Sequence, residues 1–188
     1  LVNDLLILAR LDEGVPVEKT PVELVALASE AVRTATAVGP EWPVRFTATR
    51  PVEITGDKDR LRQVVDNLLA NVRAHTPPGT PTTVQVEEVG DEAEIVVRDS
   101  GPGMPTDEAR RVFERFYRAD RARTRPHGGS GLGLSIVSAI VAAHGGTVTA
   151  DSAPGQGMTV TVRLPSSSAP AAEPVPDPDP AEVAQPVG

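Results

Sequence analysis

Residues 57–75 carry the strongest periodic pattern in the chain. Apolar residues recur there at spacings of three and four, which predicts an amphipathic helix with one buried stripe: Leu61, Val64, Val65, Leu68, Leu69 and Val72. Pro77, Pro78 and Gly79 end this helix. Because a helix with one apolar face must bury that face, the rest of the chain must supply a sheet or further helices.

Further elements are predicted on both sides of this helix. Helical spacing of apolar residues predicts helices over residues 1–12, 23–38 and 132–144. Strands are predicted over residues 44–49, 52–55, 82–89, 93–98, 147–151 and 158–164, with a tight turn at Gly90-Asp91. We therefore expect an α+β fold, a two-layer α/β sandwich in which helices cover one face of a mixed, mostly antiparallel sheet.

The pattern predicts one folded unit between two different ends. Residues 1–13 are expected to be the end of a longer helix, because a helix of about a dozen residues is not stable alone in water. Residues 14–21 are interpreted as a linker and residues 22–165 as the folded domain. Residues 166–188 are rich in proline, alanine and acidic residues, and we expect them to be disordered.

Composition excludes several classes of function. The chain has 188 residues and no cysteine, which rules out disulfides and cysteine-ligated metal sites. It has 26 acidic and 18 basic residues, a net charge of -8, so its surface has the wrong sign for gathering nucleic-acid phosphates. No apolar run reaches the roughly 20 residues that a membrane-spanning helix needs.

Polar residues recur every fourth position on the helix over 57–75. Gln63, Asn67, Asn71 and His75 form one ridge beside the apolar stripe. Asparagine is a mediocre helix former, so two of them in this row favour a half-buried polar site. An amide oxygen suits Mg²⁺ that keeps most of its ligands as water and phosphate. The alternative is an ordinary solvent-exposed helix face.

Asp99 follows a predicted strand and precedes two glycines. A carboxylate only accepts hydrogen bonds, which matches the exocyclic amine of adenine. Gly101 and Gly103 allow a positive φ and a close approach of the backbone to a ligand, and they could act as a hinge. The alternative is a common Asp-Ser-Gly turn.

A second glycine-rich segment leads into the helix over 132–144. Gly129, Gly131 and Gly133 would present free N–H groups and the positive end of the helix dipole to an anion. The segment lacks the Lys-Ser/Thr of the Walker phosphate loop and the glycine spacing of dinucleotide sites. A helix start built only for tight packing is the alternative. The loop over residues 99–129 is rich in Gly, Pro and Arg, and loops of this length are usually functional lids or disordered.

These motifs occur in a fixed order, together with the segment Phe113-Glu-Arg-Phe-Tyr-Arg118 and a final Gly155-x-Gly157-x-Thr159. In this order they closely resemble, over about residues 1–165, the catalytic ATP-binding domain of sensor histidine kinases, of the Bergerat type shared with DNA gyrase and heat-shock chaperone ATPases. Residues 1–12 resemble the end of the second dimerisation helix of such kinases.

The resemblance implies ATP and Mg²⁺ as ligands, a mobile ATP lid, and transfer of the γ-phosphoryl group to a histidine on an upstream dimerisation domain. The phosphoryl group would pass to an aspartate of a response regulator. The full protein would be a homodimer in the bacterial cell membrane, with this part as a cytoplasmic domain. None of the three histidines (His75, His127 and His144) is expected to be the acceptor, so the chain would carry the kinase half only.

The resemblance also implies roles near the metal and the base. Asn71 would coordinate Mg²⁺, with Asn67 supporting the ion or the phosphates. Arg73 and His75 would adjoin the nucleotide. Asp99 would bind the adenine amine, aided through water by Thr159.

The lid residues have implied roles as well. Gly101 and Gly103 would be its hinge, Phe113 and Phe116 would anchor it, and Arg118, Arg121 or Arg123 would reach the phosphates. The residues implied to close over the triphosphate are Gly129, Ser130, Gly131, Leu132 and Gly133.

Three positions depart from related patterns. Many kinases of this family carry lysine where this chain has Ala74, and threonine where it has Met158. ATP-driven clamps carry a glutamate general base at the position of Asn67, and an amide cannot accept a proton effectively. This favours the kinase over a hydrolase. A nucleotide-binding module without catalysis would lack Asn71, Asp99 or the lid glycines, and a serine kinase of the anti-sigma type would not need the first helix.

Overall fold

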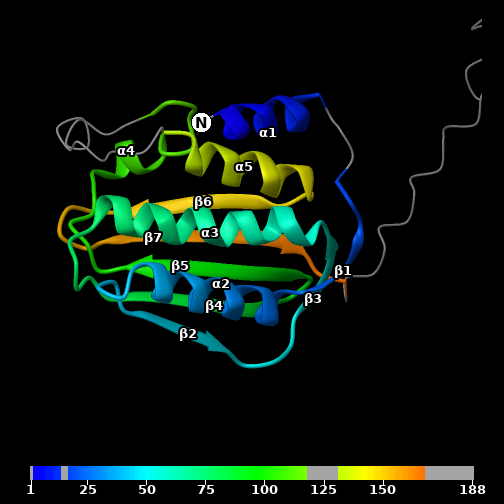
Figure 1. The fold of residues 1–188 in the computed structure, drawn as a ribbon, viewed down its shortest axis with the longest axis horizontal. Helices are drawn as coiled ribbons and strands as arrows, with labels where there is room; N and C mark the ends of the chain where they lie inside the picture. Colours follow the sequence, from blue (N-terminus) through cyan, green and yellow to red (C-terminus); the bar gives the residue numbers. More distant parts are fainter. Residues whose placement is uncertain (1, 14–16, 118–130, 168–188) are drawn as a thin grey trace, which may run out of the picture.

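The computed structural model describes residues 2–13, 17–117 and 131–167. Its main sheet has five strands in the order β2-β4-β5-β7-β6 (Figure 1). The β2–β4 pair is parallel and the other three pairs are antiparallel, so the sheet is mixed and mostly antiparallel as expected. The strands are β2 (Val44–Ala48), β4 (Thr82–Val89), β5 (Glu92–Asp99), β6 (Thr147–Ser152) and β7 (Met158–Pro165).

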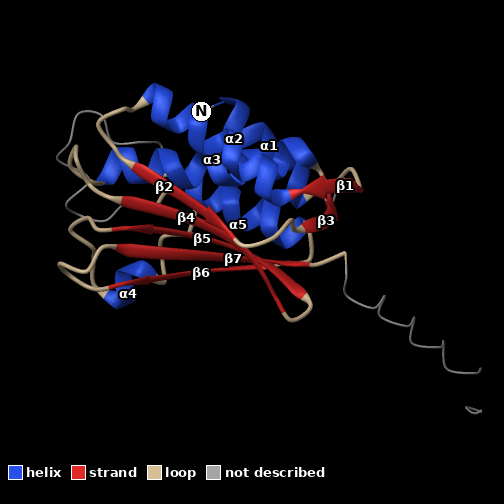
Figure 2. Cartoon of the chain, turned by 90° about the horizontal axis from the view of Figure 1, so that it is seen from below, coloured by secondary structure: helices blue, strands red, loops and turns tan. Residues whose placement is uncertain are grey.

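Four helices form a second layer on one face of this sheet (Figures 1 and 2). Neighbours in the layer follow the order α1-α5-α3-α2. The helices are α1 (Val2–Asp12), α2 (Leu24–Val38), α3 (Lys58–His75) and α5 (Gly133–Ala143). A short fifth helix, α4 (Thr106–Ala109), contacts β6 at the edge of the sheet. The predicted two-layer α+β architecture is confirmed.

The core lies between α3 and the inner face of the sheet. All six residues of the α3 stripe are buried, and Val64 and Val65 are completely inaccessible. The sheet contributes alternate residues, since successive strand side chains point to opposite faces: Val84, Val86, Ile95, Val97, Val160, Val162 and Leu164.

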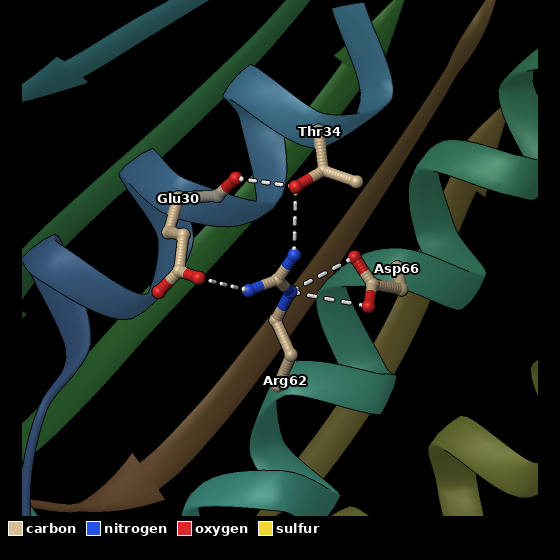
Figure 3. A network of polar contacts seen from close by, with 4 residues as sticks. All are labelled: Glu30, Thr34, Arg62 and Asp66. Atoms are coloured by element: carbon tan, nitrogen blue, oxygen red, sulfur yellow. Dashed lines mark hydrogen bonds and ion pairs between the residues drawn. The ribbon is translucent and has the colours of Figure 1, made fainter. Parts of the chain in front are cut away.

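A polar cluster joins α2 to α3 above the core (Figure 3). Arg62 contacts Asp66 on its own helix (3.1 Å) and both Thr34 (3.0 Å) and Glu30 (3.3 Å) on α2. The cluster is partly exposed, so each ion pair contributes about 0–1 kcal/mol and mainly fixes how the two helices lie side by side.

A second, two-stranded sheet corrects one expectation. Residues 14–21 are not all linker, because β1 (Thr20–Glu23) pairs antiparallel with β3 (Glu53–Gly56). The neighbouring predicted strands 44–49 and 52–55 therefore belong to different sheets. The Glu23 carboxylate explains this corner: it accepts the N–H groups of Val25 (2.9 Å) and Ala26 (2.6 Å), and that of Val52 (3.2 Å).

Both ends of the folded unit differ from the expected boundaries. On α1, Ile7 and Leu8 are buried and the helix contacts α5, whereas Leu5 is 43 % exposed. At the other end Ser166 is buried and its N–H donates to the carbonyl of Asp91 (3.0 Å), so the expected disordered tail does not begin at residue 166. Residues 168–188 lie outside the described part. Within that part, no helix combines the length and the hydropathy needed to cross a bilayer.

Candidate nucleotide site

Asp99 ends β5 as a buried carboxylate. It is 7 % exposed, and its Oδ1 accepts the N–H of Gly101 at 2.8 Å. Burial raises the pKa of Asp99 above its ordinary value, while hydrogen bonds from the backbone N–H groups of Gly101 and Met158 oppose that rise. A buried acceptor that is hard to ionise without a donor suits a ligand that brings its own N–H group.

Glycines pack the Asp99 loop against the β6–β7 turn. Gly103 has φ +61°, and a Cβ built on it would lie 2.1 Å from the carbonyl oxygen of Ala153. Gly157 has φ +72°, and its Cβ would lie 1.9 Å from the carbonyl oxygen of Asp99. The N–H of Gly155 donates to the carbonyl of Pro102 (2.7 Å). Close approach, together with the positive φ, is therefore what requires glycine at 103 and 157.

The Asn ridge lies on α3 beside the start of α5. Asn67 donates its amide N–H to the carbonyl of Gly133 (3.3 Å), which links the ridge to the second glycine segment. Asn71 is half-buried one turn further on, and its amide makes no hydrogen bond to any described residue. His75 continues the ridge as an exposed residue. The structure thus brings Asn67 to the start of α5, with Asn71 one turn further along the same ridge.

The two ends of the expected lid meet at the start of α5. The N–H of Phe116 donates to the carbonyl of Gly131 (3.2 Å). Gly131 has φ +73°, and a Cβ built on it would lie 3.1 Å from the carbonyl oxygen of Tyr117 and 3.2 Å from the backbone of Phe116. Leu132 is fully buried. A Cβ on Gly133 would meet no described atom within 4 Å. Packing therefore explains glycine at 131, whereas at 133 the described residues leave open space.

Two expected site residues lie elsewhere. Thr159 pairs with Arg98 on the outer face of the sheet, whereas Met158 pairs with Asp99, so Thr159 is on the wrong face to reach the carboxylate. Arg73 is two positions from Asn71, on the far side of α3, where its Cδ would lie 2.6 Å from a Cβ on Gly39. These two expectations are corrected.

The two phenylalanines expected to anchor the lid differ in their burial. Phe113 packs against the core as expected, but Phe116 is 61 % exposed with φ +61°, so the expectation that both phenylalanines anchor the lid is corrected. The remaining expected residues lie outside the described part of the chain: Arg118, Arg121, Arg123, His127, Gly129 and Ser130.

Sequence reasoning missed a set of buried polar neighbours of Asp99. Thr76 is 6 % exposed, accepts the indole N–H of Trp42 (3.1 Å) and donates to the carbonyl of Val72 (2.8 Å). A Cβ on Gly101 would lie 2.7 Å from both Thr76 Cγ2 and Asp99 Oδ1. Thr82 pairs with Asp99 across β4 and β5. Apolar alternation through Val84 and Val86 already placed Thr82 on the inner face, which was the available signal.

The ridge, the buried carboxylate and the glycine segments are those of a known ATPase family. Residues 56–168 match the model of the histidine kinase-, DNA gyrase B- and HSP90-like ATPases, and the chain belongs to this family. Within it, the similarity is to the catalytic ATP-binding domain of sensor histidine kinases.

Individual relatives agree. The chain is 50 % identical over 157 residues to the probable sensor histidine kinase TcrY of Mycobacterium tuberculosis, covering 82 % of this chain and 33 % of the relative. It is 41 % identical over 120 residues to the sensor histidine kinase WalK of Bacillus subtilis, covering 62 % of this chain and 20 % of the relative. The chain thus spans at most about a third of these relatives' length.

Solved structures give the same result. The mycobacterial sensor histidine kinase MprB matches with a TM-score of 0.71 and 34 % identity, covering 78 % of this chain and 98 % of that one. Full-length ShkA in complex with AMPPNP matches with a TM-score of 0.75 and 29 % identity, covering 90 % of this chain and 36 % of ShkA.

Proposed function

We propose that this chain binds Mg-ATP between α3, the end of β5 and the start of α5, and presents the γ-phosphoryl group to a histidine of a partner domain. The observation that carries the proposal is the buried Asp99 carboxylate, which accepts the N–H of Gly101 and lies on the sheet face covered by the helix layer that contains Asn67 and Asn71. The ATP analogue in the related ShkA structure supports a nucleotide as the ligand.

Each group has a defined task in this proposal. Asp99 accepts a hydrogen bond from the exocyclic amine of adenine, and the N–H groups of the first turn of α5 face the phosphates. Asn67 holds the Gly133 carbonyl and so keeps the glycine segment beside α3. Arg118 and Arg123 are proposed to approach the phosphates from the lid. Phosphoryl transfer requires positioning and charge neutralisation more than covalent participation by the protein.

The residues present fit a magnesium ion. Asn71 offers an unengaged amide oxygen beside the proposed phosphate site. Within the described residues, no group of three or more His, Cys, Asp or Glu side chains could cage a metal, which suits an ion held mainly by phosphate and water. When bound, Mg²⁺ would neutralise phosphate charge.

We further propose histidine, not water, as the acceptor. The bond from the γ-phosphorus to the bridging oxygen of ADP breaks and its electrons leave on ADP, while a P–N bond forms to the acceptor imidazole, which loses its N–H proton. No carboxylate occupies the Asn67 position to activate water. The acceptor histidine would belong to the dimerisation domain of a membrane-bound, homodimeric parent, and a response regulator would take the phosphoryl group onward.

A phosphotransfer assay tests this function. The chain is mixed with labelled ATP, Mg²⁺ and a separately purified dimerisation domain of a related kinase. We expect label on the acceptor with wild type, and an altered metal requirement with Asn71→Asp, because a carboxylate replaces the neutral ligand. Label released only as inorganic phosphate would contradict the kinase proposal. An unchanged Mg²⁺ requirement in the variant would exclude Asn71 as the metal ligand.

A further inference from the structure

Buried polar side chains gather at the end of β5. Among the described residues six polar side chains are buried, and four of them lie after α3, on β4 or at the end of β5: Thr76, Thr80, Thr82 and Asp99. Thr76 donates to the carbonyl of Val72, and Thr80 donates to the carbonyl of Pro77 (2.7 Å). These two hydroxyls are therefore satisfied by the protein itself.

Thr82 is different. It is 2 % exposed, and within the described residues its Oγ1 is the single buried side-chain nitrogen or oxygen with no hydrogen-bond partner. Leaving a buried hydroxyl unpaired is unfavourable, and such groups in folded proteins usually bond to a ligand or an ordered water. An unpaired hydroxyl in a ligand-binding site therefore points to a partner that arrives with the ligand.

The register places Thr82 directly beside Asp99. The two residues are cross-strand partners, and the N–H of Thr82 points away from β5 to the carbonyl of Pro43 on the other side (3.0 Å). The pair is thus of the non-hydrogen-bonded type, in which Cα atoms are about 4.5 Å apart and side chains are closest. On the other flank of Asp99 lies Met158, whose thioether cannot donate a hydrogen bond. Among the described residues, Thr82 thus carries the one buried hydroxyl beside the carboxylate that has no hydrogen-bond partner.

We propose that Thr82 determines base specificity: its hydroxyl donates a hydrogen bond to ring nitrogen N1 of adenine, directly or through one water. This inference rests on the proposed ATP function. Adenine presents an amine donor next to the N1 acceptor, so an acceptor-only Asp99 beside a hydroxyl donor matches both groups. Guanine presents the reverse order, with an oxygen acceptor next to an N1–H donor. The Gly101 N–H is held by Asp99 and cannot serve N1 as readily.

The test combines two variants with modified nucleotides. Thr82→Val removes the hydroxyl and keeps the shape, whereas Thr82→Ser keeps the hydroxyl. Titration calorimetry with Mg²⁺ measures affinity for ATP, for 1-deaza-ATP, which has C–H in place of N1, and for purine riboside triphosphate, which lacks the amine. We expect Thr82→Val to bind ATP about two- to tenfold more weakly, the range of one neutral hydrogen bond, and Thr82→Ser to bind nearly as wild type does.

The nucleotide comparison identifies the contact. Wild type should lose affinity for 1-deaza-ATP, and Thr82→Val should lose no more, because the same bond is removed twice. Both proteins should remain equally sensitive to loss of the amine. Unchanged ATP affinity in Thr82→Val, or losses that simply add, would overturn the inference.

A stability control separates binding from folding. Since Thr82→Val removes an unpaired buried hydroxyl, the empty variant should melt at or above the wild-type temperature. A lower melting temperature together with weak binding in both variants would show a structural role and overturn the inference. The ATP function itself fails by a different result, namely no binding of ATP by wild type or no effect of the missing amine.

Discussion

Replacing Gly157 with alanine should destabilise the domain more than the same change at Gly155. The two residues lie in one turn and both have positive φ, +72° and +78°. An alanine at either site incurs a left-handed backbone cost of about 1–2 kcal/mol. At Gly155 the new methyl group meets no described atom within 4 Å, so that cost is the whole effect.

At Gly157 the methyl group would lie 1.9 Å from the carbonyl oxygen of Asp99. The carbonyl oxygen is a backbone atom and the methyl group is bonded directly to the backbone, so neither can rotate away. The chain at Gly157 and the end of β5 must therefore separate locally, and overpacking of this kind adds about 1–3 kcal/mol. Because about 1 kcal/mol shifts the melting temperature of a domain of this size by roughly 2–4 °C, the two variants should differ by about 2–12 °C. Gly157→Ala should also weaken ATP binding, since it displaces the Asp99 end of the strand.

Thermal and urea unfolding of the full chain, followed by circular dichroism, measures the difference, and Gly155→Ala is the matched control. Equal midpoints for the two variants would refute the argument that close approach to Asp99 is what requires glycine at 157. A large loss of ATP affinity in Gly155→Ala would refute it as well, because the added methyl group meets no described atom there and the N–H bond to Pro102 is kept.

Three further predictions concern the base site. Burial raises the pKa of Asp99, so as pH rises this carboxyl ionises in the unfolded chain before it does in the folded one. Wild type therefore loses folding stability between the ordinary carboxyl pKa and the raised one. In urea titrations, Asp99→Asn should be more stable than wild type at pH 7 and should have no advantage near pH 3. Equal stability at both pH values would contradict this. Trp42, the single tryptophan, donates its indole N–H to Thr76, which packs beside Gly101, so its fluorescence should change on addition of Mg-ATP. A constant spectrum at the ATP concentration that saturates binding in calorimetry would exclude this coupling. Thr159→Val should bind ATP as wild type does, and a clear loss of affinity would mean that Thr159 reaches the base after all.

Local patterns predicted much of the fold. The α3 stripe, the hairpin of β4 and β5 and the layer architecture follow from periodicity and a tight turn, which act over a few residues. The β1–β3 sheet could not be predicted in this way. Its strands have four residues each and lie about 30 positions apart, and the buried pair Val22–Ile54 is too short an apolar pattern to identify the partner strands in the sequence.

The site shows the same division. Asp99 and the Asn ridge carry chemistry in their residue types, so sequence alone could indicate them. The roles of Thr159 and Arg73 were taken from the family resemblance without regard to side-chain direction. Strand alternation turns Thr159 outward, and helical geometry turns Arg73 away from Asn71. The exposure of Phe116 depends on how the lid ends meet at Gly131, which no local pattern encodes.

Titration calorimetry of the purified chain with ATP and GTP, in the presence and absence of Mg²⁺, measures nucleotide affinity and base preference together. We expect saturable, Mg²⁺-dependent binding of ATP in preference to GTP, and loss of that preference in Asp99→Asn, because the buried carboxylate is proposed to accept the adenine amine. No binding at millimolar ATP, or the same preference for ATP over GTP in Asp99→Asn, would contradict this expectation.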